Sequence, residues 1–144
     1  MENRKAELIE TLLPKDTNGY GNIFGGVIMS IMDKTAAVAC WRYSKNLVVT
    51  ACAQSISFHT PINTGEVVYS RATIIYVGRC SMEVEVEVEV ENVIEGTKRR
   101  GASGTFTMVA VDDNMRPVPV PSWQPETEAE LGKWRQVEKR RREK

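Results

Sequence analysis

Histidine and cysteine, the side chains that most often hold metals, are scarce in this chain of 144 residues. The sequence contains one histidine and three cysteines, Cys40, Cys52 and Cys80, which are widely separated and form no C-x-x-C pair. The ligands of a structural zinc site usually come in closely spaced pairs, and a disulfide framework needs an even number of cysteines, so neither is expected. We expect no metal, no cofactor and free thiols, as in a reducing compartment.

Net charge is absent as well, because 19 lysine and arginine residues balance 19 aspartate and glutamate residues. A neutral total argues against a strongly basic nucleic-acid-binding module. The longest unbroken apolar run, Ala36 to Trp41, is far too short to span a membrane. Charged residues also interrupt the N-terminal region, where a signal peptide would be apolar. We therefore expect a cytoplasmic protein with neither nucleic-acid nor membrane partners.

The neutral total conceals an uneven distribution of charge. Residues 133–144 hold seven basic and two acidic side chains, and the rest of the chain carries the opposite excess. Such a cationic segment binds phosphates or acidic surfaces, or it is simply solvated. With 42% hydrophobic residues the chain can build one core. We assign residues 1–125 to one domain and 126–144 to a basic C-terminal helix and tail of that same domain.

The hydrophobic pattern predicts one helix followed by strands. Residues 27–43 are apolar on almost every side of a helical wheel, which predicts a helix buried in the middle of the fold. Segments rich in valine, isoleucine, threonine and tyrosine are predicted strands: 47–58, 66–77, 81–91 and 99–111. Residues 4–13 are either a helix or a first strand, because they fit neither period well. Residues 116–125 contain four prolines and are predicted to be extended, and 126–142 form a charged helix that Thr127 could cap.

The segment from Met82 to Glu91 alternates without exception between apolar residues and glutamate. Its apolar side chains should face the core, and its glutamates should face water or a partner. The sequence thus predicts an α+β fold, a long antiparallel sheet wrapped around one buried central helix, with a charged C-terminal helix. A single sheet over one helix leaves an open sheet edge and an open helix face, so we expect self-association as a dimer.

Asp33 is the leading candidate for chemistry. On the predicted helix it falls in a stripe of otherwise small side chains, Gly26, Ser30, Ala37 and Cys40. Small neighbours let a thin ligand approach closely, and a partly desolvated carboxylate on such a helix is a better general base. The alternative is an aspartate that only reaches solvent or caps a neighbouring group.

Other candidate site residues allow both a functional and a structural interpretation. The backbone N–H groups of Gly25 and Gly26, at the start of the helix, could stabilise an oxyanion, or the glycines only permit tight packing against the sheet. Asn18 could hydrogen-bond a water or a carbonyl, or it is an ordinary turn residue. His59 has no nucleophile near it in the sequence, and we predict a surface or edge-strand residue.

Several motifs together resemble the signature of a known enzyme family. They are Asp16-x-Asn18-x-x-Gly21-x-Ile23-Phe24-Gly25-Gly26-x-x-Met29-x-x-Met32-Asp33, Val48-Val49-Thr50-Ala51, Ile56-x-Phe58-x-x-Pro61-Ile62, Val77 to Val84 and Arg116 to Pro121. Over roughly residues 10–140 the chain resembles hotdog-fold acyl-CoA thioesterases of the cytosolic or brain acyl-CoA hydrolase type.

The resemblance implies hydrolysis of acyl-CoA to a free acid and CoA, with CoA as part of the substrate and not a cofactor. Asp33 and Asn18 match the family's catalytic aspartate and asparagine, which face each other from different subunits across the dimer interface. The N–H groups of Gly25 and Gly26 would hold the thioester oxygen. Asp33 would either activate water or attack the thioester directly.

The resemblance also implies a CoA site along the sheet edge and subunit boundary. On that basis the nucleotide-side candidates are Gly78, Arg79 and Ser81. Members of the family often assemble further, as trimers of dimers, so a hexamer is implied.

Two other functions compete with hydrolysis. A hotdog protein could bind acyl-CoA without cleaving it, although a pure binder needs no carboxylate beside the thioester. A hotdog dehydratase would need a histidine with an acidic partner at the site, and His59 lies outside the helix-start motif.

Overall fold

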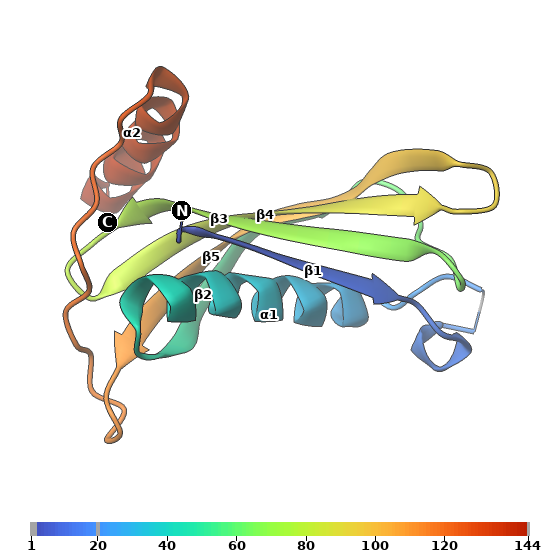
Figure 1. The fold of residues 1–144 in the computed structure, drawn as a ribbon, viewed down its shortest axis with the longest axis horizontal. Helices are drawn as coiled ribbons and strands as arrows, with labels where there is room; N and C mark the ends of the chain where they lie inside the picture. Colours follow the sequence, from blue (N-terminus) through green and yellow to red (C-terminus); the bar gives the residue numbers. More distant parts are fainter. Residues whose placement is uncertain (1–2, 20, 144) are drawn as a thin grey trace.

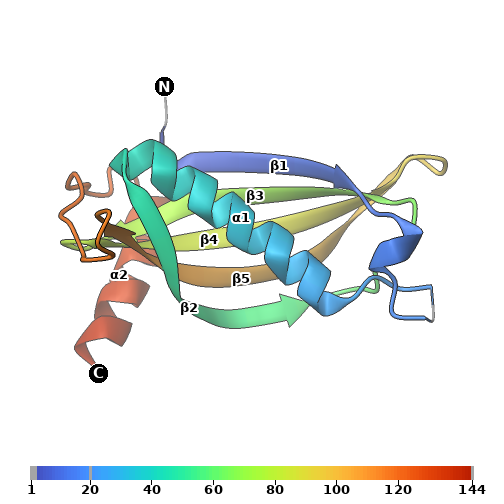
Figure 2. The ribbon, with the colours of Figure 1, turned by 90° about the horizontal axis from the view of Figure 1, so that it is seen from below.

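In the computed structural model, which describes residues 3–19 and 21–143, five strands form one antiparallel sheet and two helices pack on it (Figure 1). The elements are β1 (Lys5–Thr11), a 3₁₀ turn η1 (Pro14–Asp16), α1 (Gly25–Ser44), β2 (Leu47–Phe58), β3 (Val67–Val77), β4 (Ser81–Asn92), β5 (Thr97–Val111) and α2 (Glu128–Arg142). The strand order across the sheet is β1-β3-β4-β5-β2, so β1 and β2 are the edge strands (Figure 2).

The ambiguity over residues 4–13 is resolved as a strand. Strand β1 pairs with β3 over its whole length, from Lys5 opposite Thr73 to Thr11 opposite Val67. Its alternation is weak because an edge strand has few neighbours to bury its side chains against. The four other predicted strands are confirmed within one or two residues at each end.

The alternation in β4 produces a dry face and a charged face. Val84, Val86 and Val90 are fully buried beneath α1. The glutamates on the other face pair with cations: Glu87 with Arg100 across the strands, Glu89 with Arg71, and Glu85 with Lys133 of α2. The prediction that the apolar side chains face the core is therefore confirmed.

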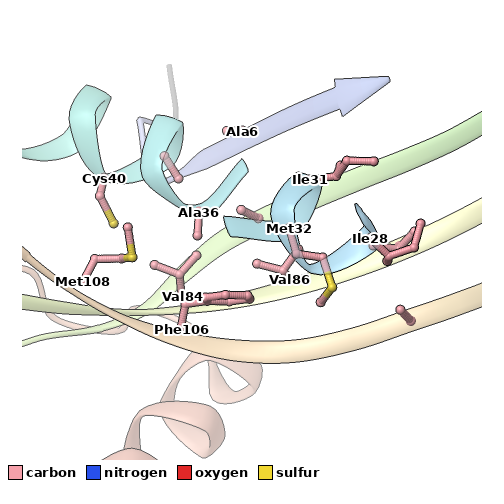
Figure 3. Packing of buried hydrophobic residues seen from close by; sticks show 14 of the residues in the cluster. Ala6, Ile28, Ile31, Met32, Ala36, Cys40, Val84, Val86, Phe106 and Met108 are labelled. Carbon is pink, nitrogen blue, oxygen red and sulfur yellow. The ribbon is translucent and has the colours of Figure 1, made fainter. Parts of the chain in front are cut away.

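Helix α1 lies diagonally across one face of the sheet, and the core forms between them (Figure 2). Ile28, Met32 and Ala36 of the helix pack toward Val84 and Val86 of β4 and toward Phe106 and Met108 of β5 (Figure 3). The helix begins two residues before the predicted start, at Gly25, and ends where Lys45 adopts a left-handed conformation with φ of 60°.

The prediction that α1 is buried on all sides is wrong for the single chain. Its buried residues lie on the side toward the sheet, whereas Gly26, Ser30 and Trp41 are exposed. The apolar wheel reflects two faces with different roles: one packs on this chain's sheet, and the other is an outward surface that still carries large apolar side chains.

Helix α2 lies on the opposite face of the sheet from α1, at the end where β3 turns into β4 (Figures 1 and 2). Thr127 caps it as predicted: its hydroxyl accepts the N–H of Glu130, whose carboxylate accepts the N–H of Thr127. Only Val137 of this helix is buried. After a turn at residues 113–115, the proline-containing residues 116–125 form no helix, and Pro117 makes an isolated bridge to Val111.

Candidate active site

Asp33 and a threonine of the neighbouring strand form the centre of the candidate site. The Thr50 hydroxyl of β2 donates a hydrogen bond of 2.6 Å to Oδ1 of Asp33, which is half-buried on α1. A β-bulge follows Thr50, since the pairing of β2 with β5 skips Ala51. Bulges re-aim side chains locally. Because Oδ1 is engaged by Thr50, Oδ2 is the oxygen that can act on a bound molecule.

The sequence predicted Asp33 but not the role of Thr50. Thr50 belongs to one of the quoted motifs, yet nothing in strand periodicity indicates that its hydroxyl reaches a carboxylate 17 residues earlier. Its partner on β5 is Met108, whose side chain is buried in the core, so Thr50 must face the same side of the sheet as α1. Only the register of β2 on β5, had it been known, would have indicated that Thr50 lies on the same side of the sheet as Asp33.

The start of α1 offers backbone N–H groups, as the two glycines predicted. No side chain of the described residues caps this end, and the N–H groups of Val27 and Ile28 already bond to the carbonyl of Phe24. The first N–H groups of a helix have no partner within the helix and carry partial positive charge. Gly25 and Gly26 supply the first two.

The two glycines are needed for different reasons. A Cβ on Gly25 would lie 3.2 Å from the ring of Phe58, so this position serves tight packing against β2. A Cβ on Gly26 would meet no described atom within 4 Å. The packing explanation therefore holds for Gly25, whereas Gly26 faces open space on the outward side of the helix.

Asn18 lies in the loop that leads into α1. Its N–H donates to the carbonyl of Asn22 at 2.7 Å, and Ile23 bonds in turn to Ile62 at 2.8 Å, which ties the loop to the β2–β3 connection. A cavity of about 390 Å³ opens there, and its lining includes both Asn18 and Gly25. The structure thus places Asn18 beside the start of α1.

Asp33 does not share that cavity in the single chain. Eight residues separate it from Gly25, which corresponds to about 12 Å along a helix axis at 1.5 Å per residue. A reacting carbonyl must lie within about 3 Å of both the attacking group and the oxyanion donors. The carboxylate and the N–H donors of one chain therefore cannot act on the same carbonyl.

The predicted CoA contacts lie in the β3–β4 turn, beside Arg141 of the cationic C-terminal segment. The N–H of Gly78 bonds to the carbonyl of Ser81 at 2.8 Å, and the Ser81 hydroxyl accepts 2.7 Å from Arg141 of α2. A Cβ on Gly78 would come within 2.8 Å of that guanidinium. Arg79 is exposed at the tip of the turn.

The cationic C-terminal segment is not simply solvated. Arg140 and Arg141 both bind Glu83 of β4, at 2.6 and 2.9 Å, and that carboxylate is only 2% exposed. Arg141 also lies over the ring of Tyr76, at 4.6 Å. Two of the basic residues thus attach α2 to the sheet, and one of them reaches the β3–β4 turn.

The remaining candidates are placed as follows. The imidazole of His59 forms a hydrogen bond of 2.9 Å with the Ser103 hydroxyl. His59 is exposed just beyond the end of β2, in agreement with the predicted surface position. All three cysteines are free, but Cys80 lies in the β3–β4 turn and not in a strand or the core. Cys40 is fully buried, so the predicted small-residue stripe ends at Ala37. No cluster of metal-ligating side chains occurs within residues 3–19 and 21–143.

Comparisons with known proteins identify the family of the chain. Residues 20–97 match the thioesterase superfamily model. Over 130 residues the chain is 36% identical to an uncharacterized acyl-CoA thioester hydrolase of Bacillus subtilis, covering 89% of this chain and 76% of that protein. It is 35% identical to the cytosolic acyl coenzyme A thioester hydrolase of Rattus norvegicus over 88% of this chain but only 34% of the rat protein. The chain therefore spans about a third of the length of that relative.

The similar solved structures are also thioesterases. A hexameric acyl-CoA thioesterase superposes with a TM-score of 0.90 at 32% identity, covering 98% of this chain and 90% of that one. An acyl-CoA hydrolase of Staphylococcus aureus, solved with butyryl-CoA, CoA and CoA disulfide, superposes with a TM-score of 0.85 at 32% identity, covering 98% of this chain and 88% of that one.

Three further structures of the Staphylococcus aureus hydrolase each carry alanine at a single position. The replaced residues are an asparagine, an aspartate 15 residues later and a threonine 17 residues after that.

No described helix of the present chain is long and apolar enough to cross a membrane. The resemblance seen in the sequence is confirmed, and the chain belongs to the thioesterase superfamily with the hotdog fold.

Proposed function

We propose that this protein hydrolyses acyl-CoA thioesters to a free acid and CoA. The observation that carries the proposal is the carboxylate of Asp33, half-buried on the outward side of α1 and oriented by the Thr50 hydroxyl at 2.6 Å. The names of the relatives support the same reaction. A protein that only binds acyl-CoA has no need of such an oriented carboxylate. A dehydratase is not favoured because the His59 imidazole, which lines the cavity beside Asn18, bonds to the Ser103 hydroxyl and not to a carboxylate.

Asp33 and Asn18 are the proposed catalytic residues, and Thr50 is the residue that positions Asp33. Their separations along the chain, 15 and 17 residues, are those of the three residues replaced in the Staphylococcus aureus hydrolase. Thr50 orients Oδ1 of Asp33, and Asn18 holds either the attacking water or the substrate carbonyl. The N–H groups of Gly25 and Gly26 stabilise the negative oxygen of the tetrahedral intermediate.

The reaction needs only water and the protein's own groups. A water oxygen attacks the thioester carbon while Asp33 accepts the proton, or the Asp33 carboxylate attacks first and water cleaves the resulting anhydride. In both cases the carbon–sulfur bond breaks, the CoA thiolate leaves and is protonated, and the free acid results. No metal or cofactor takes part in the proposed reaction.

We propose that the site is assembled from two copies of the chain. The separation of about 12 Å between Gly25 and Asp33 along one helix requires that Asp33 act on a carbonyl held by the partner's helix start. The outward side of α1 and the neighbouring edge strand expose Trp41, Leu47 and Phe58, each about half accessible. A second copy would bury these side chains. The hexameric relatives support further association of such dimers, and the cytosolic relative supports a cytoplasmic location.

The nucleotide end of CoA is proposed to lie at the β3–β4 turn. Gly78 and Ser81 shape the turn, Arg79 is exposed at its tip, and Arg141 is fixed against it by Ser81 and Glu83. Guanidinium groups bind phosphates through paired hydrogen bonds, which suits the phosphates of CoA.

Subunit mixing tests both the reaction and the shared site. CoA release is measured with a thiol reagent for wild type, Asn18→Ala, Asp33→Ala and an equimolar mixture of the two variants after subunit exchange. If each site combines one residue from each chain, half of the dimers are mixed and each regains one intact site, so the mixture reaches about a quarter of wild-type activity. A mixture that stays as inactive as its parents, with exchange demonstrated by mass, would place both residues in one chain's site.

A further inference from the structure

Residues 117–123, which we call the strap, lie between β5 and α2 at the same end of the molecule as the β3–β4 turn (Figure 1). Their sequence alternates proline and valine from Pro117 to Pro121. Val118 and Val120 are partly buried and pack against the core, whereas the three prolines are exposed. Proline fixes its own φ, and a residue that precedes proline favours extended backbone. The strap is therefore stiff even before it makes its contacts.

The alternation leaves few backbone donors in the strap, and each has a defined partner. Proline has no N–H, so only Val118 and Val120 can donate within residues 117–121. The N–H of Val118 bonds to the carbonyl of Ala110 at 2.9 Å, and the N–H of Val120 bonds to the carbonyl of Arg79 at 2.9 Å. The first bond joins the strap to β5, and the second joins it to the tip of the β3–β4 turn.

Two side-chain contacts hold the strap in this position. The Tyr43 hydroxyl, near the end of α1, donates to the carbonyl of Pro121, which directly follows Val120. The guanidinium of Arg4 lies over the ring of Trp123, 4.3 Å from its centroid. These contacts are made within one chain, so they do not depend on how a second copy is placed.

The side chain of Arg79 is exposed and makes no hydrogen bond or ion pair with the residues that the structure describes. Its position therefore follows from the backbone of the turn. The N–H of Gly78 closes the turn onto the carbonyl of Ser81 at 2.8 Å, and the bond from Val120 is the one that reaches Arg79 itself.

We propose that the strap positions Arg79 for the phosphates of CoA, and that the N–H of Val120 is the positioning group. The inference rests on the proposed hydrolysis and on the proposed place of the CoA nucleotide at the β3–β4 turn. A guanidinium that extends from a fixed backbone loses less freedom when it binds a phosphate. Without the bond from Val120 the turn adopts more conformations, so nucleotide binding weakens while the chemistry at Asp33 is unaffected.

The experiment compares Val120→Pro with its matched control, Val118→Pro. Each variant removes one N–H and one partly buried valine from the same motif, but only Val120→Pro removes the bond to Arg79. KM and kcat are measured with the acyl-CoA that wild type cleaves fastest and with the pantetheine thioester of the same acid, which has no phosphate.

The expected result is a change in the binding of acyl-CoA alone. Val120→Pro should raise KM for acyl-CoA about five- to tenfold with kcat within about twofold of wild type, and leave KM for the pantetheine thioester unchanged. Val118→Pro should change neither KM by more than about twofold.

A double-mutant cycle shows whether Val120 acts through Arg79. Arg79→Gln should raise KM for acyl-CoA about tenfold or more. Adding Val120→Pro to it should raise KM no further, because the group that the strap positions is then gone. Tyr43→Phe keeps the ring and removes only the hydroxyl that holds Pro121, so it tests the strap without a new proline. It should raise KM for acyl-CoA about two- to threefold.

Equal effects of the two proline variants would overturn the proposal, as would additive effects of Val120→Pro and Arg79→Gln. An equal rise in KM for the pantetheine thioester would do the same, because the strap would then act through stability alone. If the proline variants do not fold, an unchanged KM in Tyr43→Phe is the result that overturns it. Absence of hydrolysis by wild type for every substrate would instead refute the proposed function.

Discussion

The two helices pack on opposite faces of the same sheet by different forces. Helix α1 buries Ile28, Met32, Ala36 and other apolar side chains against β3, β4 and β5, so its position depends on the hydrophobic effect. Helix α2 buries only Val137 and docks through charged groups, above all Arg140 and Arg141 on Glu83. A helix held by its apolar side can expose a carboxylate at low cost, whereas a helix held by ion pairs uses part of its charge to stay in place.

The comparison predicts that function and stability separate between the helices. Asp33 lies on the outward side of α1 and contributes nothing to the core, so its removal should affect turnover and leave folding intact. Glu83 is the buried anchor of α2, so its removal should affect folding and leave the chemical step intact. Four substitutions test this separation.

The largest effect is expected for Asp33→Ala. Loss of a general base lowers the rate about 10²–10⁴-fold, and the melting temperature should stay close to that of wild type because the side chain is only half-buried. CoA release and thermal unfolding are measured on the same preparation. Lys34→Ala is the matched control, since it changes the adjacent exposed side chain, whose ammonium is 3.9 Å from Glu10. Near-normal turnover in folded Asp33→Ala protein would remove Asp33 from the chemistry.

The next effect is on stability and comes from Glu83→Gln. The substitution leaves two guanidinium groups next to a neutral amide. We expect the free energy of unfolding to fall by about 2–3 kcal/mol. This loss lies at or below the values usual for a broken buried ion pair, because the two arginines are one-third exposed. Glu87→Gln on the same face of β4 is the control, since its pair with Arg100 is exposed and should cost under about 1 kcal/mol.

Denaturant titration measures the free energy of unfolding of Glu83→Gln and of Glu87→Gln. The kcat of either variant should stay within about twofold of wild type, because neither carboxylate contacts the reacting atoms. Equal losses of stability in the two variants would mean that α2 is not anchored at Glu83, and the contrast between the helices would fail.

Much of the fold follows from local sequence patterns. The alternation from Met82 to Glu91 predicted which side of β4 is buried, and Thr127 predicted the start of α2, because each signal is contained in neighbouring residues. Where a segment has few neighbours, as in β1, the pattern is weak and left helix and strand unresolved.

The missed features all depend on contacts between distant residues. Glu83 and Arg140 are 57 residues apart, so the alternation placed Glu83 on the outer face without revealing that α2 would cover it. Thr50 reaches Asp33 only because β2 pairs with β5 in a particular register. The outward side of α1 was predicted to be buried because a helical wheel does not distinguish burial within one chain from burial between two.

A smaller effect on activity is expected for Thr50→Val. The hydroxyl touches Asp33 and not the reacting atoms, so its loss removes one charge-assisted hydrogen bond and leaves the carboxylate less well oriented. We expect kcat to fall about tenfold, and Thr50→Ser, which keeps the hydroxyl, to recover most of the rate. Steady-state kinetics with both variants measure this. If valine and serine behave alike, the hydrogen bond has no part in turnover.

The smallest effect concerns the buried end of α1 at alkaline pH. Burial raises the pKa of the Cys40 thiol to about 12, whereas in the unfolded chain it ionises near its ordinary value. The folded state therefore retains its proton where the unfolded state loses it, so stability is fully present below about pH 9 and declines as the pH rises toward 12. At pH 9.5 the loss from this thiol should be about 0.8 kcal/mol.

Comparing wild type with Cys40→Ala between pH 7 and 9.5 isolates this contribution, because tyrosines and lysines titrate equally in both proteins. The alanine variant should lose less stability over that interval, and unfolding in denaturant at each pH measures the difference. Parallel pH profiles would show that the thiol is reached by water in the native state. Because Cys40 lies on α1 and is fully buried in the core, such a result would also mean that this end of the helix opens readily. The contrast with α2 would then no longer rest on a closed apolar contact.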